Sequence, residues 1–175
     1  MKKISLLAIV SLFLGFAGQK LDAQELKFGH IDTDALIQGL PEFETAVARL
    51  ENLHRELSDA LETMQVELNN RAFEYERNAA TLTDLVRQAR EQELMDMNRR
   101  VQEFSQAASI RMQESQAEFF QPIMNNVERA IREVGRENNF LYIFNVSQGG
   151  TTLLYFDEAR STDVTALVRA KLGVR

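Results

Sequence analysis

Histidine, cysteine and closely spaced carboxylates are the residues best able to carry chemistry, and this chain offers few of them. It contains two histidines, His30 and His54, and no cysteine. A metal or catalytic role for either histidine would need partner groups, and the sequence shows no matching ligand set. We therefore predict a packing or hydrogen-bonding role at a strand end for His30 and a place in a helix seam for His54.

The acidic residues and one glycine pair are the remaining candidates for chemistry. Carboxylates on solvated helix faces are typically solubilising rather than catalytic. Gly149 and Gly150 could suggest a phosphate loop, but they lack the flanking lysine and the following helix that such a loop needs. The sequence therefore predicts no enzyme activity, no metal and no cofactor, and the function must come from shape and surface.

The dominant element is a helical pattern that runs from Pro41 to about Asn138 and is broken once, at residues 78–83. Pro41 suits the first helical position. Apolar residues then recur in steps of four and three, which is typical of a coiled-coil seam. The predicted seam of the first helix is Phe43, Val47, Leu50, His54, Leu57, Leu61, Met64 and Leu68. The returning helix offers Leu94, Met97, Val101, Phe104, Ala108, Met112, Phe119 and Ile123.

Folding this pattern about residues 78–83 brings together positions whose numbers sum to about 162. The predicted neighbours include Phe43 with Phe119, Leu50 with Met112, His54 with Ala108, Leu61 with Val101, Leu68 with Leu94, Arg71 with Glu91, and Tyr75 with Arg87. Small side chains meet large ones, and opposite charges meet where the seam turns polar. This consistency favours one long antiparallel helical hairpin over a continuous rod.

Local signals mark where the returning helix begins and ends. Thr81 or Thr83 can cap its start. Pro122 removes one backbone donor and should kink the helix. The apolar stripe continues beyond it, so the helix should carry on at a new angle. Residues 138–139 are both asparagine, which tolerates the left-handed conformation and predicts a stop there.

The seam weakens toward the turn, where arginines occupy places that an apolar residue would pack better. Fewer buried contacts mean easier fraying, so we expect a stiff base and a mobile tip. The four arginines near the tip are Arg71, Arg77, Arg87 and Arg90.

The two ends of the chain are rich in β-forming residues and predict a small head. Residues 26–31 and 140–144 read as strands, with a short helix at 32–38 that stops at Gly39. A turn at 147–150 and a partner strand at 151–156 predict a β-hairpin.

The chain should end in one more short helix. We expect Thr165 to cap this helix, with Leu167, Val168 and Leu172 on one face.

The first 23 residues resemble an export signal. Two lysines precede an apolar run that is too short to favour a membrane-spanning helix, and the residue types at Leu21 and Ala23 suit cleavage after Ala23. Cleavage would remove three lysines and one aspartate and change the net charge from −6 to −8. We therefore expect an exported periplasmic protein, and its acidic surface disfavours nucleic acid as a partner.

Several short segments, in this order, resemble the Skp/OmpH family of periplasmic chaperones. Residues 27–32 resemble the family's first strand, residues 41–43 the start of its first helix, and residues 120–123 the approach to its last helix. The closing strands and helix are matched by Phe140 to Asn145, Leu153-Leu154-Tyr155 and Asp163-Val164-Thr165. Their spacing around a long charged hairpin, behind an export signal, makes the resemblance specific.

The resemblance implies an α+β, mostly helical homotrimer whose hairpin arms surround a cavity. It implies an ATP-independent holdase whose partners are unfolded outer-membrane proteins. The expected division is a signal peptide at 1–23, a head at 24–40 and 123–175, and an arm at 41–122 with its tip near 78–83. Head and trimer core residues are then Leu26, Phe28, Leu141, Ile143, Leu153 and Tyr155. The family's best-known arms are basic, whereas this chain is acidic, so we carry over no lipid contact.

A holding chaperone needs weak, dispersed apolar contacts. Val66 and Phe73 lie seven residues apart on the face opposite the seam, and Met95 and Ile110 also fall off the seam. We predict that these four residues face the client. Lone exposed apolar residues are also ordinary, so that reading stays open, as does a structural spacer or adaptor of the cell envelope as the alternative function.

Overall fold

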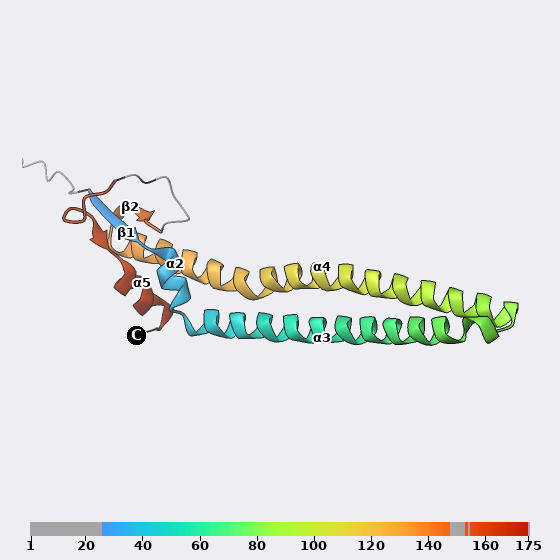
Figure 1. Ribbon diagram of the computed structural model, residues 1–175. Helices are drawn as coiled ribbons and strands as arrows, with labels where there is room; N and C mark the ends of the chain where they lie inside the picture. Colours follow the sequence, from blue (N-terminus) through green and yellow to red (C-terminus); the bar gives the residue numbers. More distant parts are fainter. Residues whose placement is uncertain (1–25, 148–152, 154, 175) are drawn as a thin grey trace, which may run out of the picture.

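The structure is a computed structural model that describes residues 26–147, 153 and 155–174. It consists of a long two-helix arm joined at one end to a small head (Figure 1). Helices α3 (Pro41–Asn78) and α4 (Asp84–Glu137) lie side by side and are joined at the far end through a 3-10 turn, η1 (Ala79–Thr81). The predicted hairpin with a small β-containing head is confirmed.

Helix α3 begins as its sequence predicts. Pro41 is the first helical residue, after an extended Leu40, and Glu42 and Glu44 occupy the first turn, where the helix dipole favours negative charge. No glycine or proline follows until the helix ends at Asn78. At a rise of 1.5 Å per residue, the helix is roughly 57 Å long.

The two ends of α4 show different capping. Thr83 holds the extended N-cap position but makes no side-chain capping bond. The Thr81 hydroxyl instead donates to the Asn78 carbonyl at 2.8 Å, so neither threonine side chain caps α4. Helix α4 continues past Pro122, as predicted, and stops at Asn138, which is followed by Asn139 at φ 56°.

The head sheet contains three described strands, β1 (Lys27–Ile31), β2 (Phe140–Asn145) and β3 (Thr162–Asp163). They lie in the order β2-β1-β3, and both pairings are parallel. Parallel neighbours need a long crossover connection, and the whole arm provides that connection between β1 and β2.

The predicted β-hairpin after β2 is not seen in the described part of the chain. Leu153, Tyr155 and Phe156 belong to no strand, while residues 148–152 and 154 lie outside the described residues. Short-range turn signals suggested an antiparallel partner at 151–156. Strand β1 pairs with one edge of β2, and β3 takes the other edge of β1.

Two short helices complete the head. Helix α2 (Thr33–Gln38) is capped by the Asp32 side chain and ends at Gly39, as predicted. Helix α5 (Thr165–Leu172) departs from its prediction in two ways. Thr165 is its first helical residue rather than its cap, and Leu167 is exposed while Val168 is fully buried.

A single buried cluster joins the base of the arm to the head. Its aliphatic side chains come from β1, α2, the first turns of α3, the last turns of α4, and α5 with its N-cap. The cluster consists of Ile31, Leu36, Ile37, Leu40, Ala46, Ile123, Val127, Ala130, Val134, Val164 and Val168. Because α4 supplies cluster residues on the head side of Pro122, the same helix that forms the arm also packs into the head.

The seam differs in detail from the predicted pattern. His54 is exposed and Leu53 is half-buried, so the placement of His54 in the seam was wrong. After Leu50, the seam continues with Leu53, three positions on, rather than with His54, four positions on. The Phe43 ring pairs with Phe120 at 5.4 Å, one residue beyond the position that the predicted register assigns.

Candidate functional surface

The described residues include no candidate metal site, and His30 makes structural contacts. No cluster of three or more histidine, cysteine or acidic side chains there could hold a metal ion. His30 Nδ1 lies 2.9 Å from the Ser161 hydroxyl, and its ring packs 4.7 Å from Phe156. The predicted packing and hydrogen-bonding role of His30 is confirmed.

The four residues predicted to face a client are all exposed on the arm. Their exposed fractions are 50% for Val66, 67% for Phe73, 59% for Met95 and 50% for Ile110. Val66 and Phe73 lie on α3 and the other two on α4, so the structure presents them as separated contacts along the arm rather than as one patch.

Two exposed apolar residues near the tip were missed by the sequence reading. Leu85 is 78% exposed and Val86 is also exposed, both in the first turn of α4. Their positions could have indicated this exposure, because both follow the break at residues 78–83 and precede Leu94, the first seam residue predicted for α4. They add apolar surface to residues 83–92, which are all exposed and, apart from these two and Ala89, polar.

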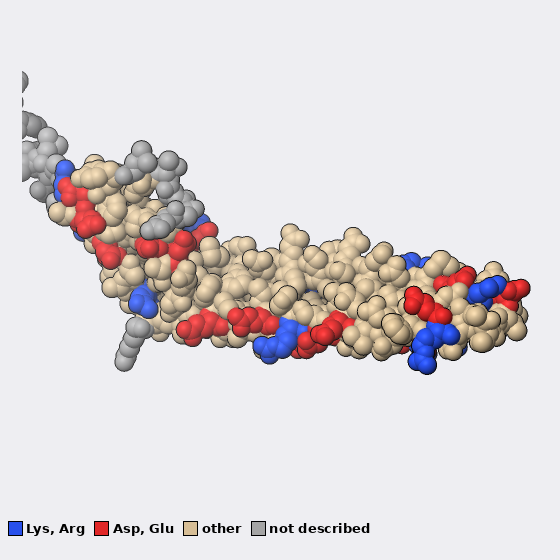
Figure 2. All heavy atoms as spheres, viewed as in Figure 1, with Lys and Arg blue, Asp and Glu red and all other residues tan. Residues whose placement is uncertain are grey.

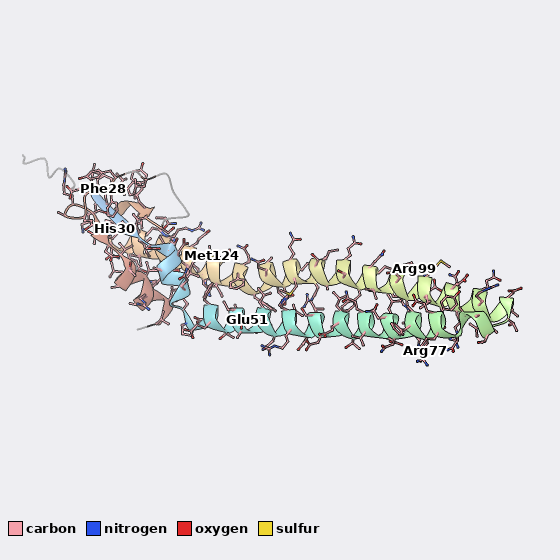
Figure 3. The ribbon with its side chains drawn as sticks, in the orientation of Figure 1. Phe28, His30, Glu51, Arg77, Arg99 and Met124 are labelled. Atoms are coloured by element: carbon pink, nitrogen blue, oxygen red, sulfur yellow. The ribbon has the colours of Figure 1, made fainter. Side chains whose placement is uncertain are left out.

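The four arginines lie near the tip, and three of them form ion pairs within their own helix. Arg71 pairs with Glu74 at 3.4 Å, Arg90 with Glu93 at 2.6 Å, and Arg87 with Asp84. Figure 3 shows Arg77 projecting from the arm near its tip. Each of the three ion pairs lies within a single helix and is exposed, so it adds little to stability.

One side-chain hydrogen bond joins the helices near the tip. The Tyr75 hydroxyl donates to the Glu91 carboxylate at 2.5 Å, and this bond raises the pKa of Tyr75. The predicted pairing of Arg71 with Glu91 is wrong, because Tyr75 holds Glu91 and Arg71 pairs within α3. Beside Tyr75, a small hollow of about 150 Å³ lies between the two helices.

The six predicted head-core residues are mostly at the surface of the single chain. Leu26, Leu141 and Tyr155 are half or more exposed and form no core within the described chain. Within the described part of the chain, Ile143 is the one of the six that packs against the buried cluster. The core lies instead between the sheet and helices α2, α4 and α5, where the alternate strand residues point.

The outer face of the head sheet carries aromatic side chains. Phe28 and Tyr142 pair across β1 and β2 at 6.4 Å, and Phe144 lies 5.8 Å from Tyr142. Phe28, Phe144 and Phe156 line a hollow of about 800 Å³. Figure 3 places Phe28 and His30 at this end of the molecule, away from the arm.

These features define a class of protein in which an antiparallel helical arm projects from a small head with a parallel sheet. No helix in the described ranges is both long and apolar enough to span a bilayer. A family model described as outer membrane protein (OmpH-like) matches residues 27–172. The chain belongs to this OmpH-like family, as its sequence segments predicted.

A solved structure shares the fold. It is the crystal structure of an OmpH-like protein from Caulobacter crescentus CB15, assigned as an outer membrane chaperone. The TM-score is 0.72 and the identity 13%, over 84% of this chain and 83% of that chain. No curated protein matches the sequence.

Proposed function

We propose that this protein is an ATP-independent periplasmic holdase that binds unfolded outer-membrane proteins and prevents their aggregation. Membership in the OmpH-like family supports a chaperone-type role. The observation that carries the proposal is a long arm, packed into the head at one end only, with exposed apolar side chains along both of its helices.

The free energy that each exposed residue could contribute to client binding suits a holdase. Fully burying a large apolar side chain contributes about 1.5–3 kcal/mol, so covering Val66, Phe73, Met95 or Ile110, each already partly covered, would add roughly 1 kcal/mol. Several such contacts hold a client, while each one alone exchanges easily. Methionine adapts its shape to different partners, which suits a varied clientele.

We further propose that three copies associate through their heads, so that three arms surround a cavity. Sheets made only of parallel strands usually have both faces covered, whereas Phe28 and Tyr142 are exposed on the outer face of this one. In this arrangement residues 24–40 and 123–175 form the head, and residues 41–122 the arm. The proposed contacts between copies are Leu26, Phe28, Leu141, Ile143, Leu153 and Tyr155.

The test is suppression of aggregation without nucleotide. Light scattering of a urea-unfolded outer-membrane β-barrel protein, diluted into buffer, should fall when the wild-type protein is present. A Val66→Ser/Phe73→Ser variant should suppress less, and a Leu167→Ser control should match wild type, because Leu167 is an exposed apolar residue of the head. A wild-type protein that leaves aggregation unchanged, as a structural spacer would, refutes the proposal.

The mass in solution tests the assembly separately. Light scattering of the folded protein should give three times the chain mass. A monomer would remove the cavity, although it would leave a role for single arms.

A further inference from the structure

Part of the arm carries an uncharged polar strip that the function proposed above does not explain. On the middle of α4, exposed residues separated by three or four positions share one flank of the helix. This flank row consists of Asn98, Gln102, Ser105, Ser109, Gln113 and Gln116. Every member bears an amide or a hydroxyl, and none bears a charge.

The charged residues of the same stretch lie on other faces of α4. Arg99 pairs with Asp96 at 3.0 Å and with Glu103 at 3.7 Å, and Arg111 pairs with Glu118 at 3.5 Å. Ion-paired residues three, four or seven positions apart share a face, so these charges gather away from the flank row. Figure 2 shows uncharged spheres along the middle of α4, with acidic and basic spheres following the outer edge of α3.

The seam register identifies the α3 residues that lie beside this strip. The numbers of Phe43 and Phe120, whose rings are in contact, sum to 163. By that register Ser58 lies opposite Ser105, and Gln65 lies opposite Asn98. Both α3 residues are exposed and uncharged, but Glu62 lies between them on the same row of α3 and is charged. The uncharged strip is therefore continuous on α4 alone, and α3 adds single neutral positions beside it.

We propose that an extended segment of unfolded polypeptide lies along the flank row. This inference rests on the holdase function proposed above and specifies the surface that the client meets. Amides and hydroxyls can each donate and accept hydrogen bonds, so the row can pair with unpaired backbone groups of any client sequence. Between residues 42 and 121 the chain has sixteen acidic and nine basic residues, so most of the arm would repel an acidic client. The uncharged flank row would not repel it.

The length of the row suits one strand of a membrane β-barrel. Gln116 follows Asn98 by eighteen residues, which is about 27 Å along the helix. An extended chain covers that distance in roughly eight residues, close to the 9–11 residues of a membrane-spanning β-strand. Met95 precedes the row by three positions and Ile110 adjoins it, which offers apolar contact to the client's alternate side chains.

A charge placed on the row tests the proposal. We would measure the Kd for a fluorescent, urea-unfolded outer-membrane β-barrel protein of net negative charge. A Gln102→Glu/Gln113→Glu variant lowers the net charge by two on the row. An Arg100→Gln/Arg111→Gln control lowers it by the same amount on the opposite flank of α4, where both residues are exposed.

The row variant should raise the Kd at least tenfold, and the control should raise it less than threefold. Equal weakening would show that only net charge matters, and an unchanged Kd would place the client elsewhere; either result overturns the proposal. A changed mass of the row variant in solution would make the row a contact between copies and would also overturn it. No binding by the wild-type protein would instead refute the holdase function itself.

Discussion

Gly29 offers a sharp test of how the head is packed. It lies in β1, between β2 and β3. A β carbon added there would lie 3.0 Å from Val164 Cγ1, 3.2 Å from Ile143 Cγ1 and 3.4 Å from Phe140 Cδ1. The first two distances are shorter than the 3.4–4 Å of an ordinary carbon contact, and Val164 is fully buried. We therefore predict that Gly29→Ala destabilises the head.

The expected magnitude follows from two opposing terms. Overpacking a tight core costs about 1–3 kcal/mol. Alanine also restricts the unfolded chain, which returns about 0.4–1 kcal/mol where the glycine φ is not positive, as at Gly29. The net loss should be about 1–2 kcal/mol. Val164→Ala alone should cost about 2 kcal/mol, because two buried carbons are removed and a cavity remains.

The double variant separates a clash from a general loss of stability. In Gly29→Ala/Val164→Ala the new methyl group occupies space that Val164 has vacated, so the combined loss should fall short of the sum by about 1–2 kcal/mol. Urea unfolding followed by circular dichroism at one protein concentration measures all three variants.

Gly135→Ala is the matched control for this cycle. Gly135 lies inside helix α4, and a β carbon added there would contact only Ile143 Cδ1, at 3.5 Å. This change should therefore raise the free energy of unfolding by about 0.5–1 kcal/mol. If Gly29→Ala stabilises as much as Gly135→Ala, or if the losses in the double variant simply add, the packing argument is refuted.

Two further predictions concern polar groups. The Ser115 hydroxyl is buried without a hydrogen-bond partner among the described residues, so Ser115→Ala should raise the unfolding free energy by about 1 kcal/mol in urea; a loss would reveal a hidden partner. Hydrogen bonds from the Thr165 hydroxyl and backbone N–H lower the pKa of Asp163 below 3.8. The ionised Asp163 carboxylate therefore stabilises the fold fully above its unfolded pKa of 3.8. This stabilisation is lost as the pH falls through the lower pKa of the folded state. The Tm gap between wild type and Asp163→Ala should narrow with acidification, and a constant gap would contradict this origin.

The helices could be predicted because their signals are local. Pro41 at the start of α3, the break after Asn78 and the asparagines at 138–139 each act within one helical turn. The apolar repeat then fixed the antiparallel pairing to within one residue, since Phe43 meets Phe120 instead of Phe119. Periodicity alone could not choose between Leu53 and His54, because steps of three and four both keep to the seam.

The head could not be read in the same way because its pairings are distant in sequence. The β1 and β2 pairing joins Phe28 to Tyr142, across the entire arm. Turn residues after β2 favoured a nearby partner, and that short-range signal carries no information about β1. Leu26 and Leu141 are exposed in the single chain, so their predicted place in a core depends on contacts between copies, which a single chain does not contain.

The arm shows why net charge is a poor guide to a binding surface. Its acidic excess disfavoured nucleic acid and lipid, and that conclusion concerns the long-range field of the whole molecule. A client in contact meets one face, and contact energies depend on the groups of that face. On α4 the ion pairs of Arg99 and Arg111 collect the charges on other faces and leave the flank row neutral. Under the proposed binding mode, an acidic arm would hold an acidic client that lies on its neutral side.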